Sequence, residues 1–303
     1  MDVILLGSMA VHYYEFDYRK PIDMDCVIHF DDLEEFQELY KLKSLVPRRV
    51  NKFHGIDPDG KHYEIEVAGL LEESSSDLLY GIRDNFHRGN GNTFIPPLNL
   101  LLQIKLCHQF KFSKHFEKTR NDILFLRKVT TKFIDALWED FLLARSKEAM
   151  KKTPRLKGVS KEEFFVDKYG DVKQIVHDTI HLCQALDGLP AYTRFQKGEV
   201  ECCMKTFFEV DEQVRLNAVF EESATLAVER AIWPSQYKCD EYKAFRGSLQ
   251  RLCCHITSGR FREYAWENYD KVLAMYKNGD ILKRLETGFK NGTVKFQKEG
   301  ETV

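Results

Sequence analysis

The chain lacks the long apolar runs of membrane proteins. It also lacks the N-terminal basic segment and apolar core that form the signal peptide of secreted proteins. No stretch of its 303 residues reaches the roughly 18 consecutive apolar side chains that a transmembrane helix needs. The first residues, MDVILLGSMAVHYY, contain no basic segment followed by a long apolar core, so they do not resemble a signal peptide. These absences predict a cytoplasmic protein with no membrane partner.

The chain also has no large excess of positive or negative charge. The formal net charge is -2 and the pI is about 6.6, so a nucleic acid could be held only by a local basic patch. The segment from Lys105 to Lys132 is a candidate for such a patch. Its other basic residues are Lys111, Lys114, Lys118, Arg120, Arg127 and Lys128. Runs of this kind are more often solvated helix faces, and both interpretations stay open.

Cysteine spacings typical of metal sites are absent as well. None of the eight cysteines forms a C-x-x-C pair, and two pairs are adjacent, Cys202 with Cys203 and Cys253 with Cys254. This pattern favours buried free thiols over a disulfide framework or a zinc site. Apolar residues make up 43% and charged residues 30% of the chain, which is ordinary for a globular protein and argues against long disorder.

The first hundred residues alternate between strand and helix patterns. An apolar run over residues 3–6 stops at a glycine and predicts a buried strand that enters a turn. Residues 23–28 and 62–67 alternate polar and apolar side chains and predict two further strands. Between them, DDLEEFQELYKL predicts a helix behind an aspartate cap. From Pro97 onward the pattern is helical.

The length and this change of pattern predict an α/β (α+β) protein with two domains. We expect a small mixed-sheet domain over residues 1–150 and a mostly helical domain over residues 151–303. The boundary is placed at the Lys-, Pro- and Gly-containing segment 151–158. Within the second domain, helices are expected over residues 171–186, 211–233 and 243–280.

Acidic side chains gather on two of the predicted strands. Asp23 and Asp25 lie two residues apart, so both carboxylates leave the same face of their strand. Mg²⁺ prefers such oxygen ligands, and a third acid from a neighbouring strand would complete the site. Glu66 is the first choice for that position. Glu64 shares its face, and the alternation does not separate the two.

Gly7 and Ser8 join the first predicted strand to the segment that leads to these aspartates. A glycine turn that opens a helix offers backbone N–H groups to a phosphate at close range. An apolar strand, Gly-Ser, a short helix and Asp-x-Asp on the next strand form the signature of the DNA polymerase β superfamily of nucleotidyltransferases. The segment VILLGSMAVHYYEFDYRKPIDMDCVI resembles that signature over its whole length. It is also similar to nucleotidyltransferase-like proteins of bacteriophages and large DNA viruses.

The resemblance implies an enzyme that moves NMP from an NTP to an acceptor and releases pyrophosphate. Asp23, Asp25 and Glu66 would hold Mg²⁺ or Mn²⁺ and carry the catalysis. The triphosphate would be bound by Gly7, Ser8 and Lys105, with His108, Lys118 and Asp122 on the same side. RNA, a protein or a small molecule could be the acceptor, and the second domain would select it.

Met9 is a departure from the viral group, in which the loop typically reads Gly-Ser-Arg-Ala. Because methionine cannot pair with an anion, this residue supports an alternative hypothesis. In that alternative the chain is a degenerate module that binds a nucleotide or a host protein without turnover.

The second half of the chain has a weaker signal of its own. His177 and His181 would lie one turn apart on a helix, a spacing that can bind a transition metal. Glu222 and Glu229 occur among apolar residues and are expected to be partly buried. They could ligate a metal in a hydrolase or form salt bridges with arginines such as Arg230, Arg260 or Arg262. Structural packing is the favoured interpretation.

Overall fold

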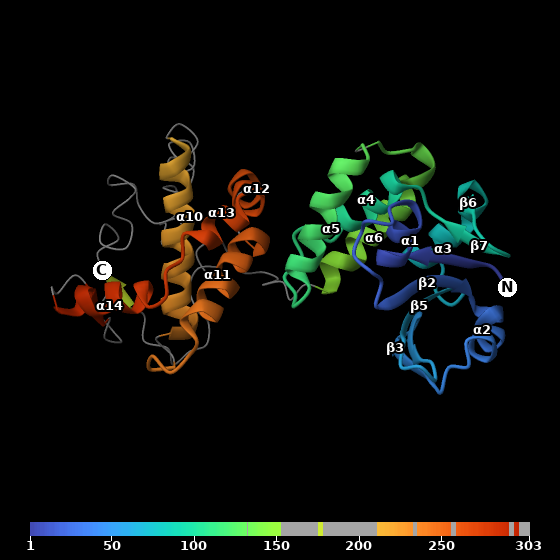
Figure 1. Ribbon diagram of the computed structural model, residues 1–303, viewed down its shortest axis with the longest axis horizontal. Coiled ribbons are helices and arrows are strands. Elements are labelled where there is room, and N and C mark those ends of the chain that lie inside the picture. The colour runs from blue at the N-terminus through green and yellow to red at the C-terminus, as the bar shows by residue number, and fades with distance from the viewer. Residues whose placement is uncertain are drawn as a thin grey trace. The chain divides into compact units, whose positions relative to one another are not determined.

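The computed structural model describes residues 1–131, 133–152, 175–177, 211–232, 235–255, 259–290 and 294–296. The chain divides into two compact units, Met1–Arg155 and Leu156–Val303 (Figure 1). Each unit is described by itself.

The first unit alternates strands and helices before it ends in helices. Its strands are β1 (Val3–Leu6), β2 (Asp23–His29), β3 (Leu45–Arg49), β4 (Lys52–Ile56), β5 (His62–Ala68), β6 (His87–Arg88) and β7 (Thr93–Ile95). Its helices are α1 (Gly7–Tyr14), α2 (Leu33–Leu39), α3 (Ser75–Gly81), α4 (Leu98–Leu106), α5 (Phe116–Val129) and α6 (Glu139–Lys152).

The strands form one mixed seven-stranded sheet in the order β3-β4-β5-β2-β1-β7-β6. At its centre β2 runs antiparallel to β1 and parallel to β5. The register of this parallel pair sets Asp25 opposite Glu64 and Val27 opposite Glu66. Because side chains alternate along a strand, the acidic residues of both strands leave the sheet on one face. The predicted sharing of a face is therefore confirmed.

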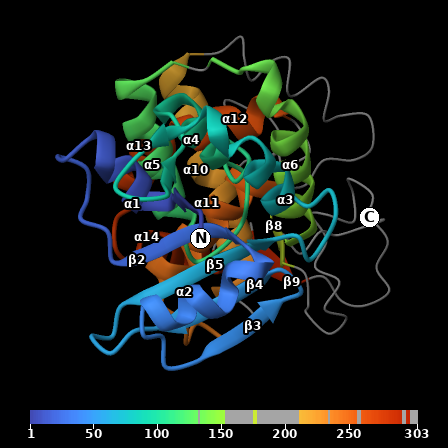
Figure 2. The same cartoon turned by 90° about the vertical axis from the view of Figure 1, so that its right-hand side faces the viewer.

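The opposite face of the sheet is apolar and is covered by α2. Phe36 of this helix is fully buried in a cluster with Met24 and Cys26 of β2 and Ile65 of β5. Figure 2 shows α2 on one side of these strands, with α4, α5 and α6 on the other. The predicted aspartate cap of α2 is wrong in detail, because Asp32 makes no capping hydrogen bond and the helix follows a 3₁₀ turn.

The described part of the second unit is mostly helical. Its elements are β8 (Ile175–His177), α10 (Glu212–Ala227) with a π-helical end (Val228–Ile232), α11 (Glu241–His255), α12 (Gly259–Glu267), α13 (Tyr269–Ala274), α14 (Asp280–Lys290) and β9 (Val294–Phe296). Phe245 of α11, Trp266 of α12 and Tyr269 of α13 are buried in its core. Cys253 and Cys254 are both buried, as expected of core thiols.

One predicted helix of the second unit is wrong where the structure describes it. Residues 175–177, inside the expected helix 171–186, form strand β8, which pairs antiparallel with β9. The β-branched Ile175 and Val176 favour such pairing. Their partner strand lies near the other end of the unit, so a local helical pattern does not reveal it.

A mixed sheet followed by a mostly helical region is the fold class that the sequence predicts, and the structure confirms it. Among the described residues, no helix combines the length and the apolar composition needed to cross a membrane.

Candidate nucleotide and metal site

The two aspartates of β2 lie close together, and their side chains are partly shielded from solvent. Asp23 keeps 29% of its side-chain surface exposed, whereas Asp25 is largely buried. Burial, and then the negative charge of Asp23, raises the pKa of Asp25. Asp23 Oδ1 is buried and has no hydrogen-bond partner within the described part of the chain. Lys118 Nζ, 3.7 Å from Asp23 Oδ2, compensates this negative charge only in part, and a bound cation would supply the rest.

Gly7 lets the start of α1 pass directly over Asp25. Its φ is +61°, and a Cβ at this position would lie 1.9 Å from Asp25 Oδ2. Any side chain would collide with the carboxylate, so glycine is required here both by conformation and by space. Ser8 follows in the first turn of α1 and is buried. Its Oγ has no hydrogen-bond partner among the described residues.

Glu66 is surrounded by cations rather than by other acids. One oxygen pairs with Lys52, and the other lies 2.5 Å from Arg145 Nη1 and accepts a hydrogen bond from Ser76 Oγ at 3.1 Å. Burial alone would raise the pKa of Glu66, but the charges of Arg145 and Lys52 hold it well below its usual range. Both oxygens are thus engaged, and the geometry does not favour Glu66 as a metal ligand.

Glu64 is in a different position. It lies opposite Asp25 in the sheet register, 48% of its side chain is exposed, and His54 Nε2 is 4.0 Å from its Oε1. The structure therefore separates two residues that the sequence pattern does not. Nevertheless, no group of three Asp, Glu, His or Cys side chains converges as a metal site within the described residues.

Lys105 of α4 reaches the site with the help of a buried carboxylate. Its Nζ lies 2.7 Å from Asp122 Oδ2. Asp122, on α5, also accepts hydrogen bonds from the Tyr18 hydroxyl and, at 3.2 Å, from Arg19 Nε. Burial would raise the pKa of Asp122, but Lys105 and Arg19 lower it. Asp122 is therefore an anchor that fixes Lys105. Lys118 of α5 pairs with one of the aspartates, with Nζ 3.7 Å from Asp23 Oδ2.

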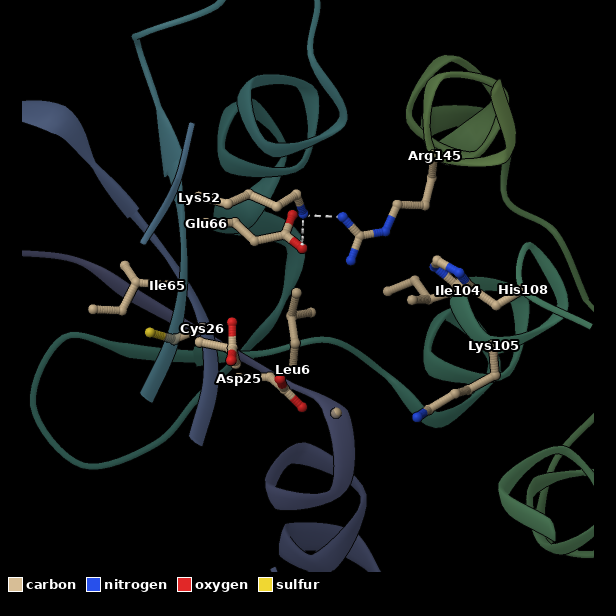
Figure 3. Close-up of a pocket in the computed structure, with 12 residues that line it drawn as sticks. Leu6, Asp25, Cys26, Lys52, Ile65, Glu66, Ile104, Lys105, His108 and Arg145 are labelled. Carbon is tan, nitrogen blue, oxygen red and sulfur yellow. Dashed lines mark hydrogen bonds and ion pairs between the residues drawn. The ribbon is translucent and has the colours of Figure 1, made fainter. Parts of the chain in front are cut away.

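These groups surround a cavity of about 160 Å³, drawn in Figure 3. The residues that line it are Leu6, Gly7, Asp25, Cys26, Lys52, Glu64, Ile65, Glu66, Ile104, Lys105, His108 and Arg145. Asp25 and Lys105 occupy one end of the view, and the cluster of Lys52, Glu66 and Arg145 occupies the other. The cavity thus has a carboxylate end and a second end where two cations meet.

Sequence reasoning missed Lys52, Arg145 and Tyr18. Lys52 and Arg145 come from β4 and α6, whose positions depend on long-range packing. Tyr18 lies in the connection from α1 to β2, and only its hydrogen bond to Asp122 on α5 reveals its role. Met9 is partly buried against the apolar cluster on the other face of the sheet and does not line the cavity. Its apolar character is explained by this packing.

The residues predicted in the second unit are only partly described. Glu222 is fully buried, as expected. His177 is the last residue of strand β8 and is not part of a helix, contrary to the prediction that His177 and His181 lie one helical turn apart. His181 and the side chain of Glu229 lie outside the described residues, and the metal-hydrolase hypothesis stays a prediction.

Residues 100–284 match the family model described as Domain of unknown function (DUF7275). The chain belongs to this family. Residues 3–82 match a second model, Domain of unknown function (DUF7277). No curated protein matches the chain.

The residues that line the cavity come from both matched regions. The DUF7277 match contains Gly7, Asp25 and Glu66, whereas the DUF7275 match begins within α4 and contains Lys105 and Arg145. The site therefore uses side chains from both matched regions.

Proposed function

We propose that the first unit is a nucleotidyltransferase that moves NMP from an NTP to an acceptor and releases pyrophosphate. The observation that carries this proposal is the contact between Gly7 and Asp25. It brings the first turn of α1, with its free backbone N–H groups, against two carboxylates whose charge Lys118 compensates only in part. A phosphate chain and a divalent cation are the ligands that satisfy both features at once.

Asp23 and Asp25 fit Mg²⁺ or Mn²⁺ by their chemistry. Asp23 Oδ1 has no hydrogen-bond partner among the described residues, and the raised pKa of Asp25 reports repulsion and burial that a cation would relieve. Glu64 is the better-placed third acid, since Glu66 is held by Lys52 and Arg145. The metal, when bound, would neutralise charge on the triphosphate and on the leaving pyrophosphate.

The chain's own groups have separate roles in this proposal. The backbone N–H groups of Gly7 and Ser8 bind the phosphates, and the Ser8 hydroxyl is available as a further donor. Lys105, fixed by Asp122, adds positive charge at the same end of the cavity. Glu64 is exposed enough to take the proton from an acceptor hydroxyl and pass it to solvent.

A second candidate function is a nucleotide-binding module without turnover. The absence of a converged three-residue metal group within the described residues favours it. Such a module would bind an NTP without needing Mg²⁺ and would form no product.

A transfer assay separates the two functions. The full chain is incubated with each α-labelled NTP, Mg²⁺ or Mn²⁺, and RNA, protein and small-molecule acceptors. We expect label transfer and pyrophosphate release by the wild type, and a loss of about a hundredfold or more in Asp23→Asn plus Asp25→Asn, because the metal contributes several kcal/mol.

The matched control is Asp31→Asn plus Asp32→Asn, an acidic pair just beyond the end of the same strand. It should retain wild-type activity. Equal behaviour of the wild type and the Asp23/Asp25 variant on every acceptor would contradict the enzyme hypothesis.

A further inference from the structure

Basic side chains line the cavity and continue beyond it in a protein whose net charge is -2. They come from the β3–β4 hairpin, from α4 and the connection to α5, from the start of α5 and from α6. We name this group the cationic arc; its members are Arg49, Lys52, Lys105, Lys111, Lys114, His115, Lys118 and Arg145.

The inner members of the arc line the cavity itself. Lys52 and Arg145 meet at Glu66, and Lys105 lies toward the other end, where Asp25 also lines the cavity (Figure 3). The Nε of Arg145 is buried and has no hydrogen-bond partner within the described part of the chain. A buried donor of this kind calls for an acceptor, which an anionic ligand in the cavity could provide.

The outer members of the arc repel one another. Burial, and then the charges of Arg49 and Arg145, lowers the pKa of Lys111. Burial, followed by the charges of Lys114, Lys118 and Lys111, lowers the pKa of His115, whereas the charge of Asp23 acts in the opposite sense. Arg49 and Lys114 are exposed, so the positive charge continues from the cavity onto the surface.

The Lys105–Lys132 run is therefore divided by the fold. Its first part, Lys105 to Lys118, joins the arc, whereas Arg120 is buried within α5 and Lys128 lies ten residues beyond Lys118 on the same helix. At 1.5 Å per residue, that separation is about 15 Å. For the run Lys105–Lys132 the sequence leaves open a basic patch or a solvated helix face. In the fold, the first part of the run forms a compact basic patch beside the aspartates.

We propose that the acceptor is the end of a single-stranded nucleic acid. Its terminal nucleotide would enter the cavity, and its backbone phosphates would follow the arc outward over Lys111, Lys114 and Arg49. A single small anion would occupy only the inner cations, whereas repeated phosphates match a row of separated charges.

The chemistry of this proposal rests on the proposed nucleotidyltransferase function. The terminal sugar hydroxyl forms a bond from its oxygen to the α-phosphorus of the NTP. The bond from the α-phosphorus to the bridging oxygen breaks, and pyrophosphate leaves with that electron pair. The hydroxyl proton passes to Glu64 and then to solvent. The strand is thereby extended by one nucleotide.

Binding is tested separately from chemistry, on the full chain without NTP or metal. Fluorescence anisotropy is recorded with unstructured 20-nucleotide RNA and DNA probes and with a 20-base-pair DNA duplex over a salt series. The arc variant is Arg49→Ala, Lys111→Ala and Lys114→Ala. The control, Lys43→Ala, Arg88→Ala and Lys128→Ala, removes the same charge from exposed positions outside the arc.

We expect the single strands to bind more tightly than the duplex. The arc variant should bind the strands roughly tenfold or more weakly, and the slope of log affinity against log salt should fall by about 2, since each phosphate contact contributes about 0.7 for single strands. The control should bind as the wild type does.

Equal losses in the arc and control variants, tighter binding of the duplex, or no strand binding at all would overturn the inference. Transfer of NMP to a protein or small molecule, with no binding of single strands, would overturn the inference about the acceptor. It would leave the nucleotidyltransferase proposal intact. Arc-dependent strand binding with no transfer from any NTP would support the arc as a nucleic-acid surface and count against the proposed enzyme.

Discussion

At the scale of single residues, the two aspartates are what the sequence predicts best. Alternation along β2 is a local property, so the shared face of Asp23 and Asp25 follows from the sequence alone. The choice between Glu64 and Glu66 as the third acid of the site does not follow from the sequence. It depends on Lys52 and Arg145, which come from other elements and neutralise only one of the two acids.

Replacing Gly7 by alanine tests the close approach of α1 to Asp25. Gly91 has nearly the same φ, +64° against +61°, but a Cβ there would meet nothing within 4 Å. Gly91→Ala should therefore cost only about 1 kcal/mol, the strain of the left-handed conformation. Gly7→Ala adds the collision with the carboxylate and should cost clearly more and abolish nucleotide binding. Urea unfolding and calorimetry measure both; equal effects of the two changes would refute the steric argument.

Replacing Glu66 by glutamine tests its role as a buried counter-ion. The change leaves Lys52 and Arg145 without their acid and should lower the free energy of unfolding by about 3 kcal/mol at pH 7. Because the folded-state pKa of Glu66 is lowered, its contribution to stability is present above about pH 4 and is lost as the pH falls through the folded-state pKa. The difference between variant and wild type should therefore narrow at low pH.

The control for this change is Glu64→Gln, at a half-exposed position on the same strand face. Its effect on stability should stay within about 0.5 kcal/mol. A loss as large as that of Glu66→Gln would mean that the ion cluster has no special role in stability.

At the scale of elements, the strands with strong alternation are predictable and the edge strands are not. The patterns of β1, β2 and β5 are confirmed. The edge strand β3 has mostly exposed residues and a proline, Pro47, so it carries no burial pattern to recognise. The strand β8 lies where the sequence predicts a helix, because pairing with the distant β9 decides its conformation.

Replacing Phe36 by alanine tests the packing of α2 on the apolar face of the sheet. The ring is fully buried and lies near Tyr40 and Tyr63, with ring centroids 4.5 and 6.3 Å away. Its removal should lower the free energy of unfolding by about 3 to 5 kcal/mol. Leu39→Ala, at a position 63% exposed on the same helix, should change it by about 0.5 kcal/mol or less. Chemical denaturation measures both, and similar losses would show that α2 is not anchored by Phe36.

At the scale of the whole molecule, the described site belongs to the first of the two units. The cavity is lined by residues between Leu6 and Arg145, within Met1–Arg155. The DUF7275 match nevertheless runs from α4 through α14, across the division between the units. The sequence predicts a division at residues 150–151, and that boundary and the role of the second unit in acceptor choice stay predictions.

The most direct test of the central claim is calorimetric titration of the full chain with a non-hydrolysable NTP, with Mg²⁺ and with excess chelator. The account predicts that the wild type binds at least about tenfold more tightly with Mg²⁺, a gain of about 1.4 kcal/mol. Asp23→Asn plus Asp25→Asn should lose that gain, and Asp31→Asn plus Asp32→Asn should keep it. Nucleotide binding that is equally strong with and without Mg²⁺ in all three proteins would contradict the account.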